Sequence, residues 1–97
     1  MKVSINGQER YLVFKHHVPL TVTWRGEPTP TEGTLARIEA RGGEVFGEAL
    51  AAKHPLDQYC KETGRKVAMQ YLLRDLPREM RQQVWLGYRA ARGKVGV

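Results

Sequence analysis

Residues 65–76 read Arg65-Lys66-Val67-Ala68-Met69-Gln70-Tyr71-Leu72-Leu73-Arg74-Asp75-Leu76, and apolar side chains recur in them every three or four positions. That spacing gathers one set of apolar residues on a single helical face: Ala68, Met69, Leu72, Leu73 and Leu76. Polar residues at a spacing of four fall on the opposite side: Lys66, Gln70 and Arg74. The stretch therefore predicts an amphipathic helix with a mainly basic outer face.

Helical spacing extends on both sides of this stretch. Upstream it begins at Leu56, with Pro55 suited to a first turn and Gly64 as an interruption or weak point. Downstream, Pro77 starts a new helix that we expect to run to about Arg92, with residues 93–97 as a frayed tail. The buried stripe of the last helix is expected at Met80, Val84, Tyr88 and Ala91, with Leu86 and Ala90 beside it.

The first half of the chain has the period-two alternation of β-strands instead. The expected strands are Lys2–Ile5, Arg10–Lys15, Leu20–Trp24, Thr34–Ala40 and Glu44–Ala51. Asn6-Gly7 predicts a tight hairpin, because both residues tolerate a positive φ. His16–Pro19 predicts a break, and Arg25–Gly33, with its two prolines, predicts a loop.

Together these patterns predict one α+β domain over residues 1–97. It comprises a β-rich part (1–52), a basic helical part (53–92) and the frayed tail. We expect a small antiparallel sheet of four to five strands, followed by two C-terminal helices packed on one face. A length of 97 residues with 41% hydrophobic composition supports a single modest core.

The net charge of +6 is unevenly distributed. Residues 1–52 hold six basic and six acidic residues, whereas residues 53–97 hold ten basic and four acidic residues. Such asymmetry favours an anionic partner, either nucleic acid or an acidic protein, with solubility alone as the simpler explanation. A membrane is the least favoured partner, because Trp85 stands among arginines and no broad apolar face is left for lipid.

The candidate binding residues form a basic stripe across both helices: Lys66, Arg74, Arg78, Arg81, Trp85, Arg89 and Arg92. Arginines around an aromatic plane suit phosphate contact with base stacking, and they also suit a protein–protein hot spot. In the alternative interpretation, Trp85 leans toward the sheet beneath arginine stems. Gly64, Arg65 and Lys66 are a possible anion site at a helix N-terminus, with a simple helix restart as the alternative.

Catalytic and metal chemistry have weaker support. His54, Asp57 and Cys60 are three apart, and a thiol beside an imidazole is a nucleophile arrangement. Helix capping and burial of Cys60 explain the same residues without catalysis. His16, His17 and His54 lack the usual zinc spacing. We therefore expect no enzyme activity, no metal and no cofactor.

One block of the chain is distinctive: His54-Pro55-Leu56-Asp57-Gln58-Tyr59-Cys60-Lys61-Glu62-Thr63-Gly64-Arg65-Lys66-Val67-Ala68, then Leu76–Arg81, then Trp85 with Tyr88. It resembles a pattern, HPxDx(F/Y)xKxxGRKxA…LPRExR…WxxY, of small uncharacterised tailed-bacteriophage proteins, and it covers about a third of the chain. Lys53 stands where those relatives have a cysteine. The resemblance implies a phage protein acting in the bacterial host cytoplasm, and it brings no known activity.

These observations predict a non-catalytic accessory protein that binds nucleic acid, or a nucleic-acid–protein complex, through its basic helices. The alternative is an inhibitor that docks on a host enzyme or defence complex. A single cysteine and a polar N-terminal segment are typical of a cytoplasmic protein. A homodimer is possible, for example through an edge strand such as Lys2–Ile5.

Overall fold

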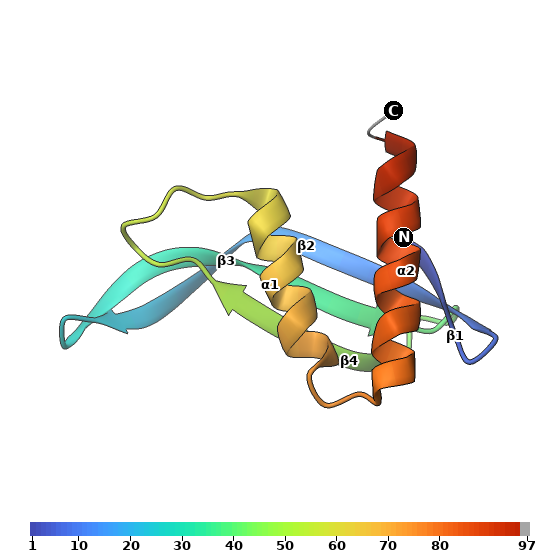
Figure 1. Cartoon of the computed structure of the whole chain (residues 1–97). Coiled ribbons are helices and arrows are strands. Elements are labelled where there is room, and N and C mark those ends of the chain that lie inside the picture. Colours follow the sequence, from blue (N-terminus) through green and yellow to red (C-terminus); the bar gives the residue numbers. More distant parts are fainter. Residues whose placement is uncertain (96–97) are drawn as a thin grey trace.

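The computed structural model describes the backbone of residues 1–95 and the side chains of residues 1–91. Four antiparallel strands are followed by two helices, which both lie on one face of the sheet (Figure 1). The elements are β1 (Lys2–Ile5), β2 (Gln8–Trp24), β3 (Glu27–Glu39), β4 (Val45–Ala52), α1 (Lys61–Leu73) and α2 (Arg78–Val95). The strands pair in chain order, so the predicted α+β class and the sheet-then-helices arrangement are confirmed.

Two-residue turns close the first two hairpins. Asn6 and Gly7 have φ values of 52° and 78°, which confirms the predicted Asn-Gly turn between β1 and β2. Arg25 and Gly26 have the same φ values and join β2 to β3. Paired positive φ values match the twist of the flanking strands, so each turn leads directly into a hairpin.

The predicted break at His16–Pro19 and the predicted loop Arg25–Gly33 are both wrong. β2 runs through the histidines with a β-bulge between Lys15 and Val18, and β3 already begins at Glu27. Two prolines of β3 lie where that strand has only β2 beside it, because pairing with β4 starts at Gly33. A proline without an N–H is tolerated on such an unpaired side.

The core lies between the sheet and the two helices. Its larger members are Val3, Leu12, Ile38, Met69, Leu73, Val84 and Tyr88. A second cluster joins Ala36 of β3, Ala51 of β4 and Ala68 of α1, where small side chains let the helix approach the sheet closely. Burying each larger apolar side chain contributes about 1.5–3 kcal/mol.

Two helical glycines make this approach possible. A Cβ on Gly64 would collide with the Thr34 hydroxyl of β3, and a Cβ on Gly87 would lie 2.8 Å from Val3 Cγ1 of β1. Gly64 is therefore a packing position inside α1, and the predicted helix interruption there is wrong.

Both helix boundaries differ from the prediction. Residues 53–60 are not helical, and α1 begins at Lys61, because side chains in the preceding segment bond to the sheet and to its own backbone. α2 continues to Val95, so residues 93–95 of the predicted tail are helical and residues 96–97 lie outside the described part. Neither helix, over the residues described, is long and apolar enough to cross a membrane.

Candidate functional site

The predicted basic stripe is distributed over both helices. Lys66 is exposed on α1, Arg74 caps the C-terminus of α1, and Arg78 and Arg89 are exposed on α2, with Arg81 partly buried. The Arg92 side chain lies outside the described residues. Both helices therefore contribute cations to the layer that covers the sheet.

Most of these cations lack an acidic partner. Lys66 Nζ lies 3.5 Å from Glu62 Oε1, one helical turn away. Among the described side chains, the four arginines of the stripe form no ion pair: Arg74, Arg78, Arg81 and Arg89. Positive charge here is consequently available to an external anion.

The sequence allowed Trp85 either to face solvent among the arginines or to lean toward the sheet, and the structure shows the second orientation. It is partly buried against the main core, and its ring meets Tyr88 edge-on, with 5.8 Å between ring centroids and 86° between planes. Leu86, expected beside the buried stripe, is instead 68% exposed. The indole therefore supports α2 from within, and it is not an open stacking surface.

Gly64, Arg65 and Lys66 do not converge on one point. The Gly64 N–H donates to the Cys60 carbonyl at 2.9 Å, because α1 begins at Lys61 and runs through Gly64. Arg65 turns toward α2, where its Nε donates to the Tyr88 hydroxyl at 3.5 Å. Lys66 faces solvent beside Glu62. The Gly64 N–H is thus already bonded within α1 and is not free to bind an anion.

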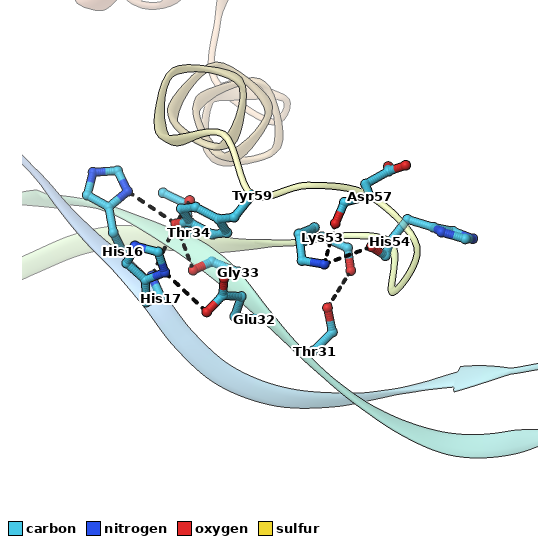
Figure 2. Close-up of polar contacts among 10 residues, drawn as sticks. All are labelled: His16, His17, Thr31, Glu32, Gly33, Thr34, Lys53, His54, Asp57 and Tyr59. Carbon is cyan, nitrogen blue, oxygen red and sulfur yellow. Dashed lines mark hydrogen bonds and ion pairs between the residues drawn. The ribbon is translucent and has the colours of Figure 1, made fainter.

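A polar cluster that the sequence did not predict surrounds the Tyr59 hydroxyl (Figure 2). The hydroxyl accepts from the His17 N–H at 3.1 Å and donates to the Gly33 carbonyl at 3.3 Å. Thr34 Oγ1 lies 2.7 Å from it and His16 Nδ1 lies 3.3 Å from it. Tyr59 thereby joins the segment before α1 to the bulge of β2 and to β3.

The two histidines of the bulge have different surroundings. His17 stacks on the Tyr59 ring at 4.2 Å, and its Nδ1 lies 3.1 Å from Glu32 Oε2. Burial, followed by the positive charge of Arg65, lowers the pKa of His16, so this ring is neutral at pH 7. The left-handed φ of 56° at His17 is what turns consecutive side chains to these separate environments.

Residues 53–60 form a braced loop next to this cluster. Lys53 Nζ donates to the carbonyl oxygens of His54 at 3.2 Å and Asp57 at 2.6 Å. The Thr31 hydroxyl donates to the Lys53 carbonyl at 2.9 Å (Figure 2). The His54 ring packs edge-on against Trp24, with 4.3 Å between centroids. These bonds explain why the apolar spacing after Pro55 does not produce a helix.

The nucleophile arrangement considered from the sequence is not assembled. A cavity of about 300 Å³ is lined by His54, Asp57 and Cys60, but none of these three side chains bonds to another. The Thr63 hydroxyl and N–H lower the pKa of the exposed Cys60 thiol, and no base contacts it among the described residues. In the same part of the chain, no three His, Cys, Asp or Glu side chains gather as metal ligands.

The cluster around Tyr59 positions the start of α1. Tyr59 directly precedes Cys60, the N-cap of α1, so its bonds to the sheet fix where the first basic helix begins. Comparison with models of known families, with characterised proteins and with solved structures gave no match.

Proposed function

We propose that this protein binds nucleic acid without catalysis, through arginines of α1 and α2. The observation that carries the proposal is that none of the four described arginines of the stripe forms an ion pair with a described residue. Guanidinium groups bond phosphate oxygens in a bidentate fashion, and they keep their charge at every physiological pH.

The positions of these arginines suit a phosphate backbone. Arg78, Arg81 and Arg89 fall on one side of α2, given 100° of rotation per residue, and Arg74 lies just before the turn that leads into that helix. Trp85 is held inward by Tyr88, so base stacking contributes little. Affinity should accordingly depend on charge, vary little with base sequence and fall with salt.

Fluorescence anisotropy with labelled single-stranded RNA, single-stranded DNA and duplex DNA tests the proposal. With about four phosphate contacts, we expect duplex affinity to fall roughly 100-fold between 50 and 200 mM salt. Arg89→Ala should reduce the slope of log affinity against log salt by about one. Lys15→Ala is the matched control, because it removes one exposed charge from the sheet. Absence of binding at low salt would refute the proposal.

A second candidate function is docking on an acidic protein, and the exposure of Leu86 favours it. Leu86 lies one turn from Gln82 and from Arg89 on α2, and an apolar anchor beside arginines is typical of interface hot spots. A pull-down from nuclease-treated bacterial lysate separates the two functions. A partner retained after nuclease and lost with Leu86→Lys supports docking, whereas loss with nuclease alone supports nucleic-acid binding.

A further inference from the structure

The two edges of the sheet differ in length and in protection. β1 has four residues, and the turn after it is held by α2, since the Asn6 N–H donates to Gln83 Oε1 at 2.6 Å. β4 has eight residues, contains no lysine or proline and pairs only with β3 among the described strands. Free N–H and C=O groups along such an edge are ready to pair with another strand.

Exposed apolar side chains gather at the same edge. Val45, Phe46 and Leu50 of β4 and Tyr71 of α1 are each between 41% and 54% exposed. A groove of about 560 Å³ runs between β4 and the C-terminal half of α1, with Phe46, Leu50 and Tyr71 in its walls. Concentrated apolar exposure of this kind marks an interaction surface.

We propose that β4 pairs antiparallel with β4 of a second copy of the chain, around a twofold axis at Ala49, to form a continuous eight-stranded sheet. This surface is distinct from the arginines of α2. It also replaces β1, the edge suggested by the sequence, with β4.

Charge favours the register at Ala49 over the neighbouring register at Glu48. Glu48 is the only charged residue of β4, and Arg37 Nε holds its carboxylate at 3.0 Å. Pairing centred on Ala49 places Glu48 opposite Leu50 of the second copy. Pairing centred on Glu48 would place two carboxylates directly opposite each other, which is unfavourable.

The position of α1 agrees with this register. Ala68 packs against Ala51, while Leu72 Cδ1 lies 3.3 Å from where a Gly47 Cβ would be, so α1 runs antiparallel to β4. Tyr71, the residue before Leu72, lines the same groove as Ala49, the proposed axis. The same rotation that pairs the strands brings Tyr71 against Tyr71 of the second copy, and both exposed surfaces are buried together.

A second copy fits this edge because the strand is self-complementary. Small residues face the helices at alternate positions, Gly47, Ala49 and Ala51, and they are symmetric about the proposed axis. An isologous interface requires this property, since each residue must meet the symmetry-related part of the same surface.

Light scattering coupled to size-exclusion chromatography tests the association over protein concentrations between about 1 and 100 µM. We expect a mass of twice 11.0 kDa for the dimer. Leu50→Lys and Tyr71→Glu should each return the protein to a monomer with an unchanged circular dichroism spectrum. Leu86→Lys, an exposed leucine on the other helix, should leave the dimer intact. A wild-type monomer throughout, or a dimer that both variants leave intact, would overturn the proposal.

Cross-linking tests the register. In a Cys60→Ser background, Glu48→Cys and Leu50→Cys proteins are mixed and oxidised. We expect the mixed pair to form a disulfide far more readily than either protein alone, because residues 48 and 50 are opposite only across the proposed axis. Equal cross-linking of the separate proteins would overturn it.

Discussion

The sheet and the helical layer differ in how many of their cations form ion pairs. In the sheet, Lys2 pairs with Glu9, and Arg37 contacts both Glu39 and Glu48. In the described helical layer, the one ion pair joins Lys66 to Glu62. Ion pairs therefore involve two of the six lysines and arginines of residues 1–52 and, among the described residues, one cation of the two helices.

This difference shows that net charge alone does not identify a binding surface. Residues 1–52 are neutral in sum and residues 53–97 carry all of the +6, yet a binding surface depends on which of these cations lack a local acidic partner. Exposed ion pairs contribute only about 0–1 kcal/mol to stability, so the unpaired arginines cost the fold little. Arginines without acidic partners are instead free to bind the phosphates of a polyanion.

The largest expected effect is on binding. Arg78→Glu combined with Arg89→Glu should abolish detectable nucleic-acid binding in the anisotropy assay, because both positions are exposed and two attractive contacts become repulsive. Lys2→Glu combined with Lys15→Glu makes the same change of net charge on the sheet and should alter affinity by less than about threefold. Equal losses in the two double variants would mean that only the overall charge matters.

The contact between the two layers is tested by Gly64→Val. The added side chain collides with Thr34, so overpacking should lower the free energy of unfolding by about 3 kcal/mol in urea denaturation. Gly42→Ala provides the control, because nothing lies within 4 Å of a Cβ there. A stable Gly64→Val protein would show that α1 does not approach β3 this closely.

The sequence predicted the two layers because hydrophobic periodicity is a local property. The change from period two to a spacing of three and four correctly separated the strands from the helices, and Asn6-Gly7 correctly located one hairpin. The rotation of α2 was not predictable in this way. A helical wheel shows neighbouring positions but not the direction of the core. It therefore left two orientations open for Trp85, and it placed Leu86 beside the buried stripe although Leu86 is exposed.

Long-range bonds account for the other differences. Tyr59 and His17 are 42 positions apart. No local pattern shows that the Tyr59 hydroxyl will accept a hydrogen bond from a backbone N–H in the bulge of β2. The prolines of β3 predicted a loop because the sequence does not show that β4 ends before reaching them. The residues of the basic stripe were identified from helical spacing alone, and their binding role stays a prediction.

Tyr59→Phe tests whether the loop before α1 depends on the sheet. Loss of the hydroxyl leaves the His17 N–H and the Thr34 hydroxyl without this partner, which should cost about 2 kcal/mol of unfolding free energy in urea denaturation. Tyr71→Phe removes an exposed hydroxyl and should have almost no effect on the stability of the monomer. Similar values for the two variants would show that the Tyr59 bonds contribute nothing net.

The smallest expected effect is the pH dependence contributed by His16. Burial, then Arg65, Lys61 and His17, lower the pKa of this ring below 6.5, so the unfolded chain binds the proton more readily than the folded chain. Stability should consequently be complete above about pH 6.5 and decline as the pH falls toward 5. Urea midpoints measured across that range should vary less with pH in His16→Gln, which retains a polar side chain but cannot titrate. Lys15→Gln, which removes an exposed charge from the same strand, should keep the wild-type slope. An unchanged slope in His16→Gln would show that groups other than His16 cause the pH dependence of stability.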